Sequence, residues 1–170
     1  MEIFHFKNTK EIRANQLLLE RKLKIKLKID GRKITAKGDP YNEYEASIIL
    51  DAMSFGFSTA KALSLTEENI IFRKINIKDF TRRKNLYEVR SRLIGREGKT
   101  KRTVEEISGC DIIIQDNTVG IIGLTESIEL ATTALKNLIR GSKQANIYRF
   151  LERTNKAKRF DDLGLKDKEQ

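Results

Sequence analysis

The segment that decides the fold of this chain is LIGREGKTKR, residues 93–102. It predicts the end of an amphipathic helix, a G-x-x-G turn at Gly95 and Gly98, and the start of a second, basic helix. Because glycine has no Cβ, two glycines three residues apart let the backbone approach a partner closely. The second helix would direct its free N–H groups and the positive end of its dipole toward the same point, which favours phosphate. The segment therefore predicts a backbone clamp for a ligand that carries phosphate groups.

Positive charge is concentrated around this turn. The 170 residues include 34 Lys and Arg against 24 Asp and Glu, a net charge of +10. Between residues 82 and 102 the basic side chains are opposed only by Glu88 and Glu97, whereas the charged side chains of residues 103–139 are acidic apart from Lys136. This concentration predicts that a polyanion binds at the turn. The alternative is that the basic residues simply form a solvated helix face.

The composition also excludes several functional classes. With one cysteine, Cys110, and one histidine, His5, the chain has neither the ligands of a conventional zinc site nor the partners for an internal disulfide. His5 lies in the first expected strand, so no serine or cysteine has a credible imidazole partner. We see no secretory signal and no apolar run long enough to span a bilayer. We therefore expect a cytoplasmic protein that is not an enzyme and uses no cofactor or metal.

Hydrophobic periodicity predicts the order β-α-α-β-β-α for the second half of the chain. The expected strands cover 70–79, 110–115 and 119–124, and the expected helices cover 82–94, 99–108 and 125–140. The G-x-x-G turn then falls between the first two helices. This arrangement is typical of a type I KH module, in which such a turn clamps about four nucleotides of single-stranded RNA.

An internal repeat appears at an offset of 85 residues, at which Gly38 matches Gly123 and Gly56 matches Gly141. Apolar positions between these glycines match as well, so residues 24–56 predict a strand, a turn, a strand and a long helix. At the same offset from the G-x-x-G turn the first half has Lys10–Arg13, without glycine. We therefore predict an α+β fold of two tandem type I KH-like units (β-α-α-β-β-α). The first unit is degenerate, and an apolar connecting helix at 57–65 docks the units rigidly.

The predicted boundaries follow from these patterns. A degenerate KH-like unit without G-x-x-G covers 1–66, and a KH domain with G-x-x-G at 95–98 covers 67–141. A basic C-terminal helix is expected over 142–160, and the polar residues 161–170 are expected to form a disordered tail.

Lysines alternate with apolar residues from Lys22 to Lys28, which predicts a strand with one apolar face and one lysine face. These lysines could form an auxiliary RNA surface, or they could keep a sheet face soluble and block edge pairing. The absence of interleaved aromatic residues slightly favours the second interpretation.

The predicted RNA site centres on the clamp. Gly95 and Gly98 would admit the RNA backbone, and the phosphates would be held by Arg96, Lys99, Lys101 and Arg102. Glu97 lies inside the clamp and would either weaken or tune the phosphate contact. We also expect that replacing both glycines by aspartate abolishes RNA binding with thermal stability nearly unchanged.

Bases would lie in a groove between the first two helices and the strand at 110–115. Ile94 and Ile113 are predicted to form its floor, and Arg90 is predicted to hydrogen-bond a base edge. For Ile113 a contact with the first unit is an equally good interpretation.

Several short segments together resemble the archaeal partner-of-Nob (Dim-two-like) KH-domain proteins, which are assembly factors of the small ribosomal subunit. The resemblance covers about residues 10–160 and rests on Phe55-Gly56-Phe57 with Ala60 and Ala62-Leu63, on INIKD at 75–79, IGREGKTK at 94–101, IIG at 121–123, and LIRGS at 138–142 with Ile147-Tyr148. The chain departs from the family where Ser142-Lys143-Gln144 replaces a proline-containing turn. It also departs where Arg96-Glu97 replaces a clamp with a lysine and no acid.

This resemblance implies that the protein binds single-stranded small-subunit ribosomal RNA near its 3′ end. It also implies that the endonuclease Nob is a partner and that a translation initiation factor could be another. We expect no membrane and no small-molecule substrate. Three alternatives stay open: a general single-stranded RNA-binding regulator, a protein-interaction scaffold for a nuclease or translation factor, and an RNA-processing hydrolase. The hydrolase would need a carboxylate cluster for metal ions, and the acids near the groove form no such motif.

Overall fold

The computed structural model describes residues 1–164. They form two compact units, one from Met1 to Phe72 and one that begins at Arg73. Each unit combines a three-stranded sheet with helices, so the predicted mixed α+β fold class is confirmed.

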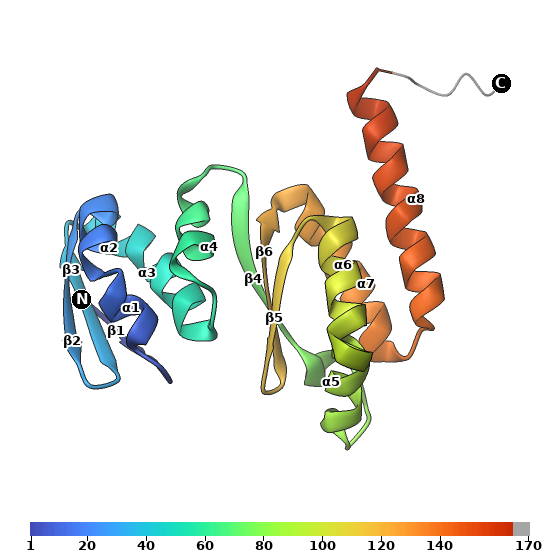
Figure 1. Cartoon of the computed structure of the whole chain (residues 1–170), viewed down its shortest axis with the longest axis horizontal. Coiled ribbons are helices and arrows are strands. Elements are labelled where there is room, and N and C mark those ends of the chain that lie inside the picture. The colour runs from blue at the N-terminus through green and yellow to red at the C-terminus, as the bar shows by residue number, and fades with distance from the viewer. Residues whose placement is uncertain (165–170) are drawn as a thin grey trace. The chain divides into compact units, whose positions relative to one another are not determined.

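The first unit builds its sheet in the order β1-β3-β2, from β1 (Glu2–His5), β2 (Ile25–Asp30) and β3 (Lys33–Gly38). Its helices α1 (Lys10–Ala14), α2 (Gln16–Leu23) and α3 (Pro40–Phe55) cover one face of that sheet (Figure 1). In β2 the apolar side chains of Ile25 and Leu27 are buried while Lys26 and Lys28 are exposed. The predicted alternation therefore separates a core face from a lysine face in β2, but the predicted strand is wrong at its start, because Lys22 and Leu23 form the end of α2.

A short helix, α4 (Thr59–Leu63), and a 3-10 turn at Ser64–Thr66 complete this unit. The Oε1 atom of Glu11 accepts hydrogen bonds from both the backbone N–H and the hydroxyl of Thr59, each at 3.0 Å. These two bonds, the backbone one first, lower the pKa of the Glu11 carboxyl. They connect α1 to α4 across 48 residues of sequence.

The first unit extends six residues beyond its predicted end at residue 66. Phe72 packs edge-on against Phe55 and Phe57, with ring centroids 5.9 and 5.6 Å apart. This aromatic cluster attaches residues 70–72 to the first unit, although they already belong to a strand of the next sheet. Periodicity within one segment cannot reveal such a contact, so the predicted boundary is corrected.

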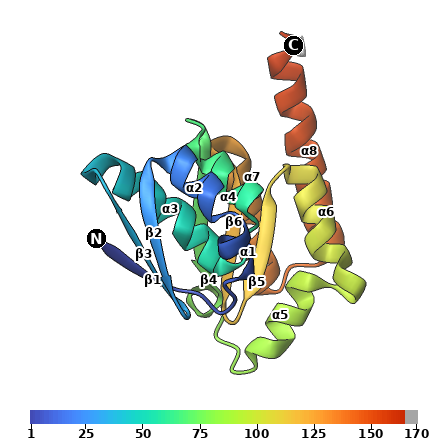
Figure 2. The same ribbon diagram turned by 60° about the vertical axis from the view of Figure 1, so that its left-hand side comes forward.

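The second unit builds its sheet in the order β4-β6-β5, from β4 (Ile70–Asn76), β5 (Asp111–Gln115) and β6 (Thr118–Leu124). The helices that pack on it are α5 (Leu86–Ile94), α6 (Lys99–Ser108) and α7 (Thr125–Arg140) (Figure 2). The first strand is shorter than predicted because residues Ile77–Phe80 form a 3-10 turn. There the side chain of Asn76 accepts the N–H of Lys78 at 3.2 Å. The first helix begins at Leu86 rather than at residue 82.

A long C-terminal helix, α8 (Gln144–Asp162), packs against α6 and α7 through the buried side chains of Ile147 and Leu151. It extends beyond the predicted end at residue 160, so the expectation of a disordered tail is wrong for Asp161 and Asp162. Aspartate is a poor helix former, but the helical hydrogen bonding continues past these residues, since the N–H of Leu163 donates to the carbonyl of Arg159 at 3.1 Å. The remaining predicted tail, apart from Leu163 and Gly164, lies outside the described residues.

Candidate nucleic-acid interface

The G-x-x-G turn joins α5 to α6 through three residues with positive φ: Gly95 at 76°, Glu97 at 55° and Gly98 at 75°. Gly95 has ψ 175°, a combination that essentially only glycine adopts. A Cβ atom at Gly95 would lie only 2.7 Å from the backbone nitrogen of Thr100. The backbone of α5 therefore folds tightly onto the first turn of α6 at this position.

Gly98 differs from Gly95 in its surroundings. It is in the left-handed conformation, with φ 75° and ψ 13°, and caps the start of α6. A Cβ atom there would meet, among the described residues, only the Nη2 atom of Arg102 at 3.9 Å. Gly98 thus faces open space, whereas Gly95 is part of the internal packing. The expectation that aspartate at both positions leaves stability nearly unchanged is therefore wrong for Gly95.

The basic side chains at the turn have different partners. Arg96, Lys99 and Arg102 are exposed, and the guanidinium of Arg102 donates to the carbonyl of Glu97 at 3.1 Å. The ammonium of Lys101 instead pairs with Glu105 at 3.0 Å along α6. The predicted phosphate ligands therefore divide into three that point toward solvent and one that is held by a carboxylate. Glu97 is also exposed, in the middle of the turn.

The three predicted groove residues lie on α5 and β5. Ile94 is 38% exposed at the end of α5, and Ile113 is half-buried in β5, where its cross-strand neighbour is Gly120. The guanidinium of Arg90 donates from Nη1 to the carbonyl of Asp116 at 3.0 Å and to the side chain of Asn117 at 3.3 Å. Arg90 thereby ties α5 to the turn between β5 and β6. Sequence reasoning missed this contact, because the residues are 26 positions apart.

The corresponding junction in the first unit has a different geometry. Its helices α1 and α2 are joined by the single residue Asn15, whose φ is −112°, outside the left-handed region. This backbone does not resemble the turn at Gly95–Gly98. Any RNA contact made by the first unit would need another kind of surface.

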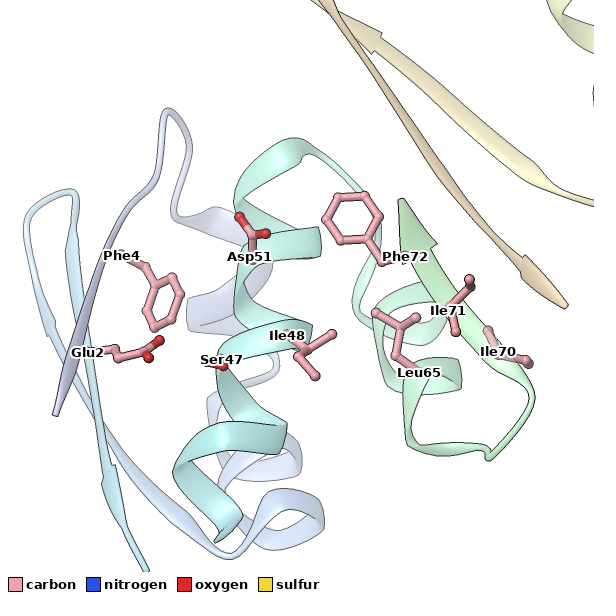
Figure 3. A pocket seen from close by; sticks show the side chains of 9 residues that line it. All are labelled: Glu2, Phe4, Ser47, Ile48, Asp51, Leu65, Ile70, Ile71 and Phe72. Carbon is pink, nitrogen blue, oxygen red and sulfur yellow. The ribbon is translucent and has the colours of Figure 1, made fainter. Parts of the chain in front are cut away.

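Two hollows of the first unit have similar volumes but linings of different net charge. The one of about 510 Å³ lies where α2 meets β2, and its lining includes the basic side chains of Arg21, Lys24, Lys26 and Lys37. The one of about 490 Å³ is lined by apolar side chains such as Ile48 and Leu65 and by the carboxylates of Glu2 and Asp51 (Figure 3). Its lining within the described chain contains no basic residue, so a phosphate would be repelled there.

Cys110 is buried, and burial is the main reason why the pKa of its thiol is raised. Within residues 1–164, no three histidine, cysteine, aspartate or glutamate side chains are grouped so that they could hold a metal ion. Within the same residues we find no helix with the length and apolar character needed to cross a membrane.

Comparison with known families identifies the second unit. The model of the eukaryotic-type KH domain (KH-domain type I), defined for the second KH domain of PNO1, matches residues 71–156. This region includes the G-x-x-G turn, both helices that flank it, and the first two thirds of α8.

Three curated relatives extend this similarity beyond the second unit. The KH domain-containing protein MJ0443 of Methanocaldococcus jannaschii is 34% identical over an alignment of 142 residues that covers 79% of this chain and 63% of that protein. RNA-binding protein pno1 of Drosophila melanogaster is 29% identical over 75% of this chain and 56% of its own length. Pre-rRNA-processing protein pno1 of Aspergillus fumigatus is 24% identical over 75% of this chain and 54% of its own length. The chain thus spans about six tenths of the length of the curated relatives it matches.

Two solved structures from Pyrococcus horikoshii have a similar fold over most of both chains. Dim2p superimposes with a TM-score of 0.76 at 32% identity, covering 89% of this chain and 98% of Dim2p. A chain of the a/eIF2alpha–aDim2p–rRNA complex superimposes with a TM-score of 0.79 at 32% identity, covering 92% of this chain and 94% of that chain.

Proposed function

Because the chain belongs to the PNO1/Dim2 family of KH-domain proteins, we propose that it is a small-subunit assembly factor that holds single-stranded ribosomal RNA in its G-x-x-G clamp. The observation that carries this proposal is the geometry of the turn: Gly98 faces open space, and exposed Arg96, Lys99 and Arg102 surround it. The names of the relatives support it, since they include RNA-binding and pre-rRNA-processing proteins and a complex with rRNA.

The clamp combines two sources of positive field. Among the described residues no side chain caps the first turn of α6, so the N–H groups at this end favour an anion. The exposed cations at the turn add charge-assisted hydrogen bonds to phosphate oxygens, which are stronger than bonds between neutral groups. The open side of Gly98 lets the RNA backbone come close to both. Ile94 and Ile113 then offer apolar surface to the bases.

In this proposal the protein positions RNA and leaves the chemistry to a partner. The RNA would be the segment near the 3′ end of the small-subunit ribosomal RNA, held so that the endonuclease Nob can mature it. A translation initiation factor is a second proposed partner, and the presence of a/eIF2alpha in the related complex supports it. The first unit, a KH-like unit without a clamp, would serve these contacts or the orientation of the RNA.

A binding titration tests the proposal directly. Wild type, Gly98→Asp and Gly109→Asp are compared on a short RNA from the 3′ end of small-subunit ribosomal RNA and on a scrambled RNA. Gly109 is a matched control, because its backbone has nearly the same conformation as that of Gly98, with φ 72° and ψ 13°, and a Cβ atom there meets no described atom within 4 Å. It ends α6 at the opposite end from the clamp.

We expect wild type and Gly109→Asp to prefer the ribosomal sequence and Gly98→Asp to lose binding. With about three or four phosphate contacts, the slope of log affinity against log salt should lie near −2 to −3. Equal binding of both RNAs that is still lost in Gly98→Asp would instead indicate a general single-stranded RNA-binding regulator. Binding that neither the RNA sequence nor Gly98→Asp affects would contradict the clamp and leave a protein-interaction scaffold.

A further inference from the structure

Two arginine side chains converge on Gly141, at the end of α7. A Cβ atom at residue 141 would lie 3.5 Å from Nη1 of Arg92 and 3.6 Å from Nη2 of Arg83. Arg92 comes from the last turn of α5, and Arg83 comes from the loop before α5. The two guanidinium nitrogens are therefore at most about 7 Å apart, with the side-chain-free Gly141 beneath them.

No carboxylate among residues 1–164 neutralises the charge of this pair. Within residues 1–164 neither guanidinium has a carboxylate within the 4.0 Å of an ion pair. Arg92 donates to the backbone carbonyl of Ser142 at 2.5 Å, which fixes its position but leaves its charge. The backbone N–H of Arg83 donates to the hydroxyl of Thr81 at 3.2 Å, which constrains the loop that carries Arg83. Two like charges thus lie close together with no carboxylate partner among residues 1–164.

The spacing suits a phosphate group. Charge-assisted hydrogen bonds from guanidinium to phosphate oxygens are about 2.7–2.9 Å long, and arginine can donate two of them in parallel. A phosphate placed between two guanidinium nitrogens that are at most about 7 Å apart can accept from both. A side chain at residue 141 would occupy this space, and Gly141 has φ 110°, a conformation that favours glycine.

The arginine pair lies beside the clamp. The side chain of Gln144, at the start of α8, donates to the hydroxyl of Thr100 at 3.4 Å. Thr100 is the residue that packs against Gly95 in the G-x-x-G turn. Arg92 is three residues before Gly95 on the same helix. Figure 2 shows α8 beginning next to the junction of α5 and α6.

We propose that Arg83 and Arg92 form a second phosphate site, which binds a phosphodiester group of the RNA strand where that strand leaves the clamp. This inference rests on the proposed function, because it needs RNA in the clamp. The site would lengthen the RNA segment that the protein holds beyond the nucleotides gripped at Gly95–Gly98. It would also give the strand a defined direction as it leaves the turn.

RNAs of two lengths test this site. Binding of a tetranucleotide, which fills the clamp, and of an octanucleotide from the same ribosomal segment is measured for wild type, Arg83→Gln, Arg92→Lys and Arg82→Gln. Arg83→Gln should weaken octanucleotide binding by about tenfold, the size expected for one hydrogen bond to a charged group, and leave tetranucleotide binding nearly unchanged. Its salt slope on the octanucleotide should fall by about 0.7. Arg92→Lys keeps the charge but loses the planar guanidinium that can donate two parallel hydrogen bonds. It should therefore weaken octanucleotide binding by less than tenfold.

Arg82→Gln is the matched control, because it removes the same charge from the neighbouring, exposed residue of the same loop. If Arg82→Gln and Arg83→Gln weaken octanucleotide binding equally, only the overall charge matters and the second site is wrong. If Arg83→Gln changes binding at neither length, the inference is also wrong. A result against the clamp can be distinguished from a result against the second site. If the clamp does not bind RNA, Gly98→Asp leaves tetranucleotide binding intact.

Discussion

Gly95 and Gly98 share one turn, yet the structure gives them different roles. The backbone of Gly95 is in a region essentially reserved for glycine and packs against Thr100, so this residue shapes the turn. Position 98 favours glycine only because its backbone is left-handed, since the space that a side chain would enter is open. Sequence pattern treats the two alike, because it records only their spacing. Stability and RNA binding should therefore separate when each glycine is replaced alone.

The first prediction concerns this separation. Gly98→Ala should cost about 1 kcal/mol of unfolding free energy, the penalty of a left-handed backbone for an L-residue. Gly95→Ala should cost about 3 kcal/mol, because a steric conflict with Thr100 is added to the backbone strain. Urea denaturation of both variants and wild type measures the two differences. Equal losses would contradict the assignment of Gly95 to the internal packing.

At the scale of elements, each unit contains a helix that is attached to another helix by specific side-chain contacts. The carboxylate of Glu11 joins α1 to α4 in the first unit through Thr59. In the second unit the buried Ile147 and Leu151 anchor α8, and Lys158 approaches Glu126 of α7 at 3.9 Å. The helix at the C-terminus is therefore part of the unit that carries the clamp. The basic C-terminal helix expected from the sequence is a packed helix whose basic side chains, such as Arg149, Arg153 and Lys156, are exposed.

The second prediction follows from the pKa of Glu11, which is lowered by its hydrogen bonds to Thr59. A carboxyl whose pKa is lower in the folded state stabilises the fold above its unfolded pKa, and this contribution disappears as the pH falls through the folded pKa. Glu11→Gln should therefore lower the melting temperature at neutral pH. The gap between variant and wild type should narrow in acid. A gap that is constant across the pH range would show that the charge of Glu11 is not involved.

The third prediction concerns α8. Leu151 has no exposed surface, so Leu151→Ala should cost about 2–4 kcal/mol by loss of burial and creation of a cavity. Its neighbour Phe150 is 38% exposed, and Phe150→Ala should cost clearly less. Chemical denaturation of the two variants compares them directly. Similar small losses would indicate that α8 contributes little to the second unit.

At the scale of the whole molecule, the groups suited to RNA are concentrated in the second unit. The clamp and the arginine pair both lie after Arg73. In the first unit the hollow with acidic and apolar lining is unsuited to phosphate, while the hollow near Lys24 is basic. The exposed Lys26 and Lys28 fit both interpretations of the lysine row, an RNA surface or a solubilising face. A net charge of +10 should steer RNA toward the molecule at low salt.

The fourth prediction is that the two units are rigidly docked, as the apolar character of residues 57–65 suggests. Residual dipolar couplings from the two units should then fit a single alignment tensor, with and without RNA. Two different tensors in the free protein would show that the units move independently. A change to one tensor on adding RNA would mean that the ligand, rather than the connecting helix, orders them.

Local patterns in the chain were sufficient to predict the mixed fold class, most strands and helices, and the position of the G-x-x-G turn. Apolar periodicity and glycine spacing report on the backbone within a few residues, so Gly95, Gly98 and the helices beside them could be located without coordinates. Helix and strand ends were less accurate, as at Leu86 and Asp162, because polar residues near an end are compatible with both helix and loop.

Contacts between segments that are distant in sequence required the folded structure. The convergence of Arg83 and Arg92 on Gly141 depends on the packing of α5 against the end of α7, about 50 residues away. The different environments of Gly95 and Gly98, and the tie from Arg90 to the β5–β6 turn, likewise depend on which atoms the fold brings together. Periodicity assigns a residue to an element, but it does not say which other element that residue will meet.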